Sequence, residues 1–529
     1  MPLSLDRQLI ERLREDLASL GPLDALFTGT ANSALRRDEL TPARIELTDQ
    51  TGPEATVARL FFFGDSVSLD DVDEAFPECR ATGLVELRVL EPGGDGLTAA
   101  VDLSPVELDG ITHWFASDSA GGHLASDHVV GVGHASLTLA GITDRTPRRY
   151  ALDLGTGGGI QAAGLAAHCE KVVATDLSSR ALTFAAFNAA LAGFTRIGPG
   201  AREHDIGDDR AGHDAALSDG LDSSAGTGVE KDAVRSGLAG ATWDLREGSM
   251  FDPVAGERFD LIVSNPPFVI TPAAAIDAGL ARYEYRDAGQ SGDRLFLDLI
   301  SDLHEHLAPG GSAQMLGNWE HRDGERFDRL AEAAVGLDLW VIEREVLDPA
   351  EYVEMWLRDG GMPDGDSRER AYAAWIADFA DRGVTAVGFG YVLARPQSGA
   401  TPIRRFETVT GPVSMPIGDH LAACFDALQR DGDIANLHLR VAEDVTIERH
   451  YRPFAEEPTA IVARQGGGLS RTILLSTALA GLFSAADGDL TAGQIAVALE
   501  SLLGEDGLAE RVLNEAAEAH EWGLLVTAD

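Results

Sequence analysis

The chain has almost no lysine and few cysteines. Of its 42 basic residues only Lys171 and Lys231 are lysines, so its positive charge is carried by arginine. Its three cysteines, Cys79, Cys169 and Cys424, lie far apart and form no C-x-x-C pair. This spacing predicts neither a disulfide framework nor a zinc site, and we expect no bound metal.

Long apolar runs are also missing. The longest, such as residues 472–483, fall short of the roughly 20 residues that span a bilayer. The first residues, 1–16, have the charge pattern of an amphipathic helix and lack the basic start, apolar stretch and cleavage site of a signal peptide. We therefore expect a soluble, cytoplasmic protein with no membrane partner.

Negative charge, by contrast, is abundant. The formal net charge is -44, and such a surface repels phosphate backbones unless a local basic patch overrides it. A basic protein partner would be attracted. A salt-rich cytoplasm or biased codon usage would also account for an acidic surface poor in lysine.

The length of 529 residues favours about three domains, at roughly 150 residues each. Residues 1–126 begin with helical patterns, including 55–65 and 68–76, and continue with predicted strands at 79–87 and 96–104. Two helices followed by a hairpin is the order of a winged-helix module. The segment 65–78 is acidic where a DNA-binding module would be basic, so a protein-docking or structural role is favoured over nucleic-acid binding.

The middle region, 127–396, alternates short apolar strands with helical stretches. The predicted strands are 149–155, 171–177, 242–248, 259–265, 312–319, 339–347 and 384–394. This alternation predicts an α/β domain with a Rossmann-like, mostly parallel sheet covered by helices on both faces, and a ligand site beyond the C-terminal ends of its strands. The segment 197–241 is rich in Gly, Asp, Ser and Ala and is expected to be a flexible insertion.

Residues 397–529 predict a C-terminal α+β accessory domain. A second winged-helix-like unit is one form that this domain could take. Its strands are expected within 435–451, and its helices at 472–485, 490–503 and 508–526. No catalytic pattern is found in this region.

A glycine loop follows the first predicted strand of the middle region. Asp153 precedes a run that contains Gly155, Gly157, Gly158 and Gly159. Glycines let the backbone approach a ligand closely, and the helix that follows offers free amide groups. A dinucleotide fingerprint would need glycine where Ile160 stands, and a P-loop would need a lysine, so both pyrophosphate-binding motifs are disfavoured.

The remaining pattern, acid-x-Gly-x-Gly-x-Gly, resembles motif I of class I S-adenosylmethionine-dependent methyltransferases. The resemblance implies that S-adenosyl-L-methionine is the cofactor and that Asp153, Gly155, Gly157 and Gly159 bind it. Asp176 ends the second strand, where such enzymes carry the acid that binds both ribose hydroxyls, because a carboxylate accepts two hydrogen bonds at once. A helix cap is the alternative role for Asp176.

The stretch Asn265-Pro266-Pro267-Phe268 follows the fourth strand and resembles motif IV of methyltransferases that modify planar nitrogens. The prolines keep the backbone rigid. The resemblance implies that the Asn265 side-chain oxygen and the Pro266 carbonyl accept both hydrogens of an NH2 group, and that this turns the nitrogen lone pair toward the methyl donor. Phe268 would stack on the flat acceptor, and no general base is required. Asn265 is also expected to contact the cofactor.

Gly289, Gly292, Asp293 and Leu295 are similar to the stretch that follows N-P-P-Y in release-factor glutamine methyltransferases. That family usually has Tyr at the position of Phe268. It also usually has an adenine-contacting Asp where this chain has Ser249, which can still form a hydrogen bond. The resemblance covers about residues 127–396 and implies a seven-stranded methyltransferase sheet. It also implies that residues 127–140 close over the cofactor and substrate.

These features favour an S-adenosylmethionine-dependent N-methyltransferase with a glutamine in a protein of the translation machinery as its acceptor. The first alternative is a methyltransferase for adenine or guanine amines in RNA or DNA, for which the arginines within 31–47 are a modest basic candidate. The second is a non-catalytic scaffold with a decayed methyltransferase core. The sequence leaves the oligomeric state open.

Overall fold

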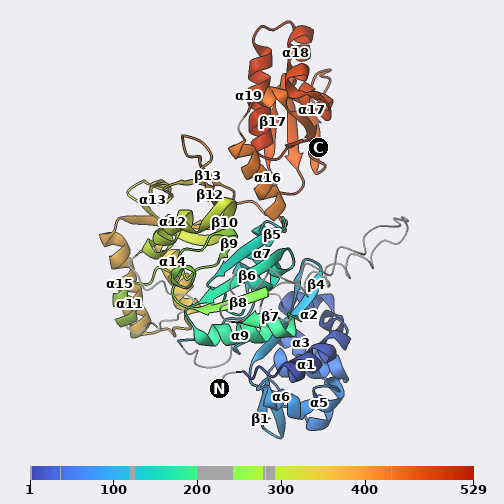
Figure 1. Cartoon of the computed structure of the whole chain (residues 1–529), viewed down its shortest axis with the longest axis vertical. Coiled ribbons are helices and arrows are strands. Elements are labelled where there is room, and N and C mark those ends of the chain that lie inside the picture. The colour runs from blue at the N-terminus through green and yellow to red at the C-terminus, as the bar shows by residue number, and fades with distance from the viewer. Residues whose placement is uncertain are drawn as a thin grey trace, which may run out of the picture.

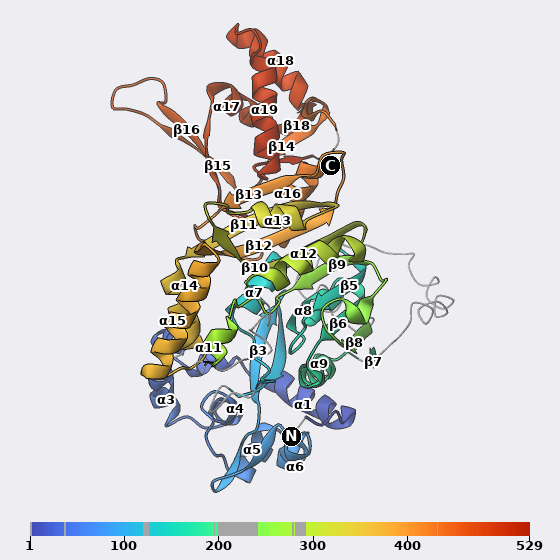
Figure 2. The ribbon, with the colours of Figure 1, turned by 90° about the vertical axis from the view of Figure 1, so that its left-hand side faces the viewer.

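The computed structural model describes residues 3–35, 37, 39–119, 126–194, 196–198, 242–277, 280, 292–430 and 432–528. The N-terminal helices lie at one end of the long axis, a large sheet lies in the middle, and the C-terminal elements lie at the other end (Figures 1 and 2). Within the described residues, no helix combines the length and the apolar character that crossing a membrane requires. Residues 199–241, most of the expected insertion, fall outside the described residues.

The large sheet contains all seven strands expected for the middle region and, within the described residues, one further strand at each edge, so it has nine strands and not seven. From edge to edge its order is β13 (Arg404–Thr408), β11 (Leu337–Leu347), β12 (Val384–Pro396), β10 (Leu307–Arg322), β9 (Phe259–Ser264), β5 (Arg148–Leu154), β6 (Cys169–Asp176), β8 (Thr242–Glu247) and β7 (Arg196–Gly198). Strands β9, β5, β6 and β8 pair in parallel, whereas β12 runs antiparallel to both its neighbours. The α/β class and the mostly parallel sheet are therefore confirmed.

Helices cover both faces of this sheet. They are α7 (His134–Ile142), α8 (Ile160–Ala166), α9 (Ser179–Leu191), α11 (Ala273–Asp277), α12 (Arg294–His306), α13 (Asp328–Ala333), α14 (Pro349–Asp359), α15 (Asp366–Asp381) and α16 (Gly418–Gln429). In β5, Ala151 packs with α7, α8 and α16 on one face, while Leu152 and Leu154 pack with α12 and α13 on the other. This follows from the two-residue period of a strand, which sends successive side chains to opposite faces.

Among the described residues, the N-terminal unit contains six α-helices and two strand pairs. They are α1 (Arg7–Ser19), α2 (Gly29–Leu35), α3 (Thr41–Leu47), α4 (Pro53–Phe61), α5 (Leu69–Ala75), α6 (Arg80–Glu86), β1 (Leu90–Gly93), β2 (Gly96–Ala99), β3 (Asp102–Leu108) and β4 (Ile111–Ser117). The strand expected at 79–87 is wrong, because this segment forms α6. Ala81, Leu84 and Leu87 recur every three residues and are all buried, which is a helical rather than an extended period. The winged-helix assignment stays a prediction.

The large sheet continues past the boundary expected at residue 396. Strand β13 pairs in parallel with β11, and Leu421 and Phe425 of α16 belong to the same apolar core as α7 and α8. Both elements therefore extend the middle region, although the sequence placed them in the C-terminal domain. The residues directly after β12, 397–402, read Gln-Ser-Gly-Ala-Thr-Pro, which is the composition of a linker, and this predicted a domain boundary where the structure has a loop between two strands of one sheet.

The C-terminal unit has its own core. Its elements are β14 (His438–Val441), β15 (Val445–His450), β16 (Ala460–Gln465), β17 (Thr472–Leu475), α17 (Thr477–Ala485), β18 (Asp487–Thr491), α18 (Ala492–Leu503), α19 (Leu508–Glu521) and β19 (Leu525–Thr527). Strands β15 and β16 form a hairpin that extends away from the helices (Figure 2). The helix expected at 472–485 begins late, because residues 472–475 pair with β16 and Ser476 caps the helix through a bond from the Leu479 amide at 3.0 Å.

Candidate active site

The candidate site lies where the strand order reverses in the large sheet. After β5 the chain continues to β6, on one side of the sheet centre. After β9 it continues to β10, on the other side, so the loops after β5 and β9 diverge. Leu154 and Ser264 are paired at the ends of these strands, and the Ser264 hydroxyl donates to the Leu154 carbonyl at 2.8 Å. Ligands of open α/β sheets bind at such a point. A cavity of about 400 Å³ opens there.

The glycine loop forms one wall of this cavity. Gly155 and Gly157 have φ values of +75° and +53°, and Gly159 has +87°, a region that side chains other than glycine rarely adopt. A Cβ at Gly155 or Gly157 would meet nothing within 4 Å, so the backbone faces open space. The amides of Gly155 and Thr156 both donate to the Thr175 carbonyl at 2.9 Å, which folds the loop onto the end of β6.

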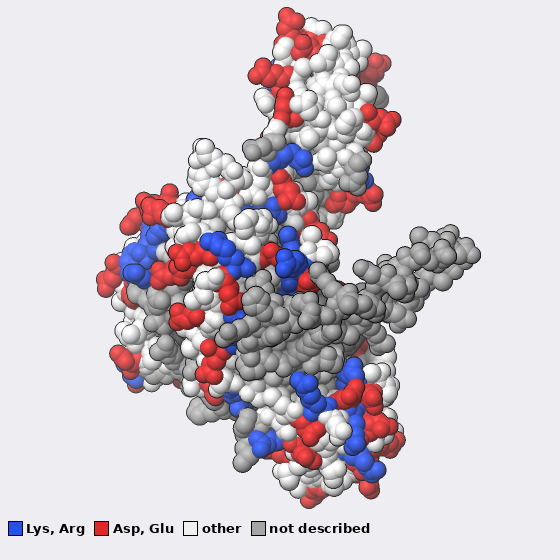
Figure 3. Space-filling model, in the orientation of Figure 1, with Lys and Arg blue, Asp and Glu red and all other residues white. Residues whose placement is uncertain are grey.

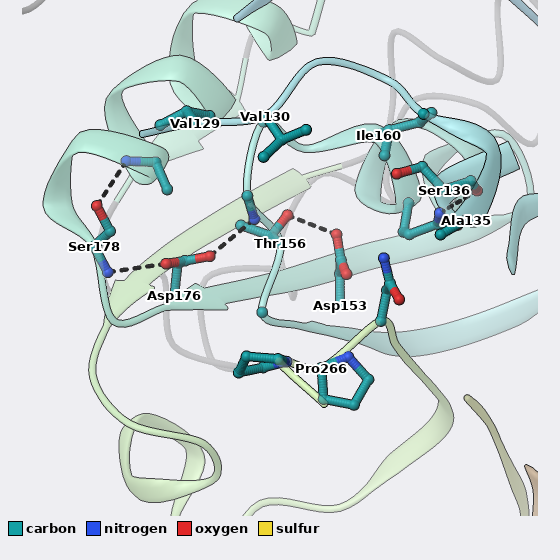
Figure 4. Close-up of a pocket in the computed structure, with 18 of the residues that line it drawn as sticks. Val129, Val130, Ala135, Ser136, Asp153, Thr156, Ile160, Asp176, Ser178 and Pro266 are labelled. Carbon is teal, nitrogen blue, oxygen red and sulfur yellow. Dashed lines mark hydrogen bonds between the residues drawn. The ribbon is translucent and has the colours of Figure 1, made fainter. Parts of the chain in front are cut away.

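Asp153 lies beneath the loop and fixes its shape. The side chain is 1% exposed, and Oδ2 accepts hydrogen bonds from the Thr156 hydroxyl at 2.6 Å and from the Ala162 amide at 3.0 Å (Figure 4). Burial raises the pKa of Asp153 to about 7, against the effect of these hydrogen bonds, and the nearby Asp176 carboxylate raises it further. Asp153 borders the cavity, but the contacts of its carboxylate are with the loop itself.

Asp176 lies at the end of β6, on the cavity wall. Its Oδ2 accepts from the Gly157 amide and its Oδ1 from the Ser178 amide, both at 2.9 Å. Figure 4 shows the carboxylate between the loop and Ser178. The cap of α9 is Ser178, whose hydroxyl accepts from the Ala181 amide at 3.3 Å. Asp176 is therefore not the capping residue.

Asn265 and Pro266 border the cavity on the side of β9. The Asn265 Oδ1 atom is buried and has no hydrogen-bond partner among the described residues. A buried amide oxygen left in this state is costly, and native proteins almost always satisfy such an atom, so it marks a place where a ligand donor would bind.

Phe268 is partly buried between two apolar clusters, one on the sheet and the other formed by α14 and α15. The loop is anchored just beyond it, because the Ile270 amide donates to the Tyr352 hydroxyl at 3.0 Å and Asn318 Nδ2 donates to the same hydroxyl at 3.0 Å. The segment that carries Asn265 is therefore held at both ends.

Of the remaining predicted residues, Ser249 borders the cavity, whereas Gly159 and Asp293 do not. Gly159 lies at the start of α8, packed near Trp243, and a Cβ there would come within 3.1 Å of the indole. Ser249 is exposed and borders the cavity. Asp293 is buried away from the cavity lining and accepts from the Glu320 amide at 2.9 Å, while Gly289 falls outside the described residues.

Residues 127–136 line the cavity, as expected for the segment before α7. In Figure 4, Val129 and Val130 lie on one side of Thr156 and Pro266 lies on the other. Gln161 of α8 donates to the Ser136 carbonyl at 2.7 Å and so ties this segment to the sheet domain. Whether the segment closes over ligands stays a prediction.

Sequence reasoning missed two groups of lining residues. Phe115, Ala116 and Ser117 come from β4 of the N-terminal unit, and Trp356 and Asp359 come from α14. Both groups lie in ordinary amphipathic elements. Their pattern could predict a strand and a helix, but only the tertiary fold brings them to the cavity.

Comparison with known proteins identifies similar sequences for two parts of the chain. Residues 20–100 match a family model described as a domain of unknown function, DUF7059. The release factor glutamine methyltransferase of Xylella fastidiosa (strain Temecula1 / ATCC 700964) is 30% identical over 185 residues, which are 34% of this chain and 50% of that protein. The protein of the same name from Geobacter sulfurreducens is 36% identical over 107 residues, 18% of this chain and 38% of that protein. The predicted resemblance is confirmed, and the chain spans about half the length or less of these curated relatives.

Among solved structures, a T. thermophilus 16S rRNA N2 G1207 methyltransferase in complex with AdoMet and guanosine is 14% identical, with a TM-score of 0.26, and covers 51% of this chain and 59% of its own. A ribosomal protein L11 methylase from Lactobacillus delbrueckii subsp. bulgaricus is 18% identical, with a TM-score of 0.22, and covers 48% of this chain and 72% of its own.

Proposed function

We propose that this chain is an S-adenosylmethionine-dependent N-methyltransferase, and that its acceptor is a planar amide nitrogen, the side chain of a protein glutamine. The observation that carries the proposal is the buried, unpartnered Oδ1 of Asn265, held on the strand next to the glycine loop. Similarity to relatives named release factor glutamine methyltransferase supports the choice of acceptor.

The described residues fit the proposed cofactor. The open backbone at Gly155 and Gly157 leaves room for a ligand close to the loop, and the Asp176 carboxylate lies where ribose hydroxyls could donate to it. Ser249 offers a hydroxyl on the same cavity. When bound, S-adenosylmethionine supplies an electrophilic methyl group on a sulfonium.

The protein's own contribution is to orient the acceptor nitrogen. An amide NH2 is a weak nucleophile because its lone pair is delocalised into the carbonyl. If Asn265 Oδ1 and the Pro266 carbonyl accept its two hydrogens, they fix the plane of the amide, and the lone pair, which lies perpendicular to that plane, would point at the methyl donor. No hydrogen bond from the described residues occupies the Pro266 carbonyl. The nitrogen loses its proton only as the new bond forms, so no general base has to act first.

The charge of the protein favours a protein acceptor over a nucleic acid. Two arginines of the N-terminal candidate patch are paired: Arg37 Nη2 lies 2.8 Å from Glu39 and Arg44 Nη1 lies 3.0 Å from Asp65. Arg36 falls outside the described residues. Among the described residues visible in Figure 3, blue groups lie with red groups beside them. At a net charge of -44, a basic partner of the translation machinery would be attracted and a phosphate polymer repelled.

A second candidate acceptor is the exocyclic amine of adenine or guanine. Trp356 and Phe268 both border the cavity, and stacking of a base on an aromatic ring contributes roughly 1–3 kcal/mol. This wall would suit a flat heterocycle as well as a carboxamide.

The proposal is tested by incubating the protein with radiolabelled S-adenosylmethionine and a lysate from cells that lack it, and then treating the product with protease or nuclease. We expect label in a band that protease removes, with methylglutamine released on complete digestion. Label removed by nuclease would support the second candidate. Binding of S-adenosylmethionine without transfer to any fraction would support a scaffold and refute an enzymatic role.

A further inference from the structure

Helix α9 belongs to two apolar cores at once. Ala189 faces the core of the large sheet, while Phe184, Phe187 and Leu191 are buried with Ile10 and other residues of the N-terminal unit. Figures 1 and 2 both place α9 between the sheet and α1. The N-terminal unit is therefore packed directly on an element of the candidate site.

Asn188 is a buried polar residue of this interface, and it joins two segments that line the cavity. It is 1% exposed. Its Oδ1 accepts from the Ala116 amide at 2.8 Å, and its Nδ2 donates to the Ala116 carbonyl at 3.0 Å and to the Gly158 carbonyl at 2.8 Å. Ala116 belongs to β4 of the N-terminal unit, and Gly158 belongs to the glycine loop.

A second connection runs parallel to the first. Asp118, directly after β4, pairs with Arg180 at the start of α9, with Nε at 3.1 Å. The Asp118 Oδ2 also accepts from the Val129 amide at 2.9 Å, and the Asp118 amide donates to the Val129 carbonyl at 3.0 Å. The end of β4 thus holds both α9 and the segment that borders the other side of the cavity.

The glycine loop depends on such bonds for its position. No atom lies within 4 Å of a Cβ placed at Gly155 or Gly157, so side-chain packing does not hold this part of the loop. Hydrogen bonds at the Gly155, Thr156 and Gly157 amides hold it from the side of β6. Asn188 links the loop to the N-terminal unit, because it bonds both to the Gly158 carbonyl and to Ala116 of β4.

We propose that the N-terminal unit is a structural part of the cofactor site, with Asn188 as a positioning residue that fixes the glycine loop against β4. This assigns a role to a unit that contains the region matched by a domain of unknown function. The inference rests on the proposed cofactor and goes beyond it, because it makes cofactor affinity depend on residues outside the methyltransferase sheet.

The test compares binding of S-adenosylhomocysteine to the full-length chain and to Asn188→Asp by titration calorimetry. The aspartate keeps the shape and the acceptor for Ala116, but it places an oxygen where Nδ2 donated to two carbonyls. We expect the dissociation constant to rise by about tenfold, the size of a lost buried hydrogen bond. The KM for the cofactor should rise in parallel, with kcat at saturating cofactor changed by less than about threefold. A purely structural role would lower the unfolding temperature and leave the KM of the folded enzyme unchanged.

Two further variants complete the test. Thr183→Ala changes a partly exposed position of α9 that does not line the cavity and whose hydroxyl donates only within the helix, to the Ser179 carbonyl, and it should bind like wild type. Asp118→Asn weakens the second connection at a less buried position and should also bind S-adenosylhomocysteine more weakly than wild type. This variant supplies the test if Asn188→Asp does not fold. Unchanged affinity in a folded variant of either residue would overturn the inference. Failure of the wild-type chain to bind would instead overturn the proposed cofactor.

Discussion

The Ser264 hydroxyl donates a hydrogen bond of 2.8 Å to the Leu154 carbonyl, between two paired strands at the centre of the sheet whose following loops diverge. One residue beyond Leu154 the glycine loop begins, and one residue beyond Ser264 lies Asn265. This bond therefore fixes how close the loop that would hold the cofactor lies to the amide that would orient the acceptor. The order of the strands places the site between β5 and β9, and the Ser264 hydroxyl links the ends of these two strands there.

We expect Asp176→Ala to weaken cofactor binding by at least about tenfold, because the carboxylate both accepts from the Gly157 amide and faces the cavity. The measurement is titration with S-adenosylhomocysteine. Ser179→Ala, at an exposed position of α9 that does not line the cavity, is the matched control and should leave the affinity unchanged. Equal binding by Asp176→Ala and wild type would refute the ribose assignment.

We expect Asp153→Asn to change how stability depends on pH. The folded protein holds a proton on Asp153 up to a pKa of about 7, whereas the unfolded chain releases it near 3.8. The contribution of Asp153 to stability is therefore fully present at low pH and declines as pH rises from about 4 to about 7. Asparagine keeps an acceptor for Thr156 and Ala162 and carries no charge.

The unfolding temperature of Asp153→Asn relative to wild type should consequently be higher at pH 8 than at pH 5. Thermal denaturation at both pH values measures this difference. Asp506→Asn, at an exposed position, should show the same difference from wild type at both. If the difference in unfolding temperature between Asp153→Asn and wild type is the same at pH 5 and pH 8, the Asp153 carboxyl is ionised in the folded protein at both pH values.

We expect Trp356→Ala to raise the KM for the acceptor by about tenfold, because the indole forms part of the wall on the acceptor side. Cofactor affinity should not change. Arg358→Ala, two residues along α14 at an exposed position that does not line the cavity, is the control. A larger effect on cofactor affinity than on the acceptor KM would mean that Trp356 lies on the cofactor side of the site and not on the acceptor side.

The sequence predicted the seven sheet strands well because each combines a short apolar run with flanking turn residues. It predicted Asp153, Asp176 and Asn265 at one end of the sheet for the same reason, since parallel strands bring their C-terminal ends together. The role of Asp153 in bracing the loop could not be predicted, because it depends on burial that only the packed loop creates.

The errors also have physical causes. Residues 79–87 contain the β-favouring Thr82 and Val85, but the burial of Leu84 against the N-terminal core decided the helix. Residues 472–475 could extend a helix by composition, and pairing with β16 overrides that preference. The lining residues of β4 and α14 come from segments far from the motifs, so their position follows from tertiary packing alone.

The most direct measurement of the central claim is the single-turnover rate of methyl transfer by Asn265→Ala, once an acceptor is identified, beside its affinity for S-adenosylhomocysteine. Loss of the orienting oxygen should lower the rate by at least about 10²-fold while the dissociation constant stays within about threefold. Asn514→Ala, on the exposed side of α19, should match wild type in both. Transfer at the wild-type rate by Asn265→Ala, or loss of cofactor binding together with transfer, would contradict the assignment of Asn265 as the residue that orients the acceptor.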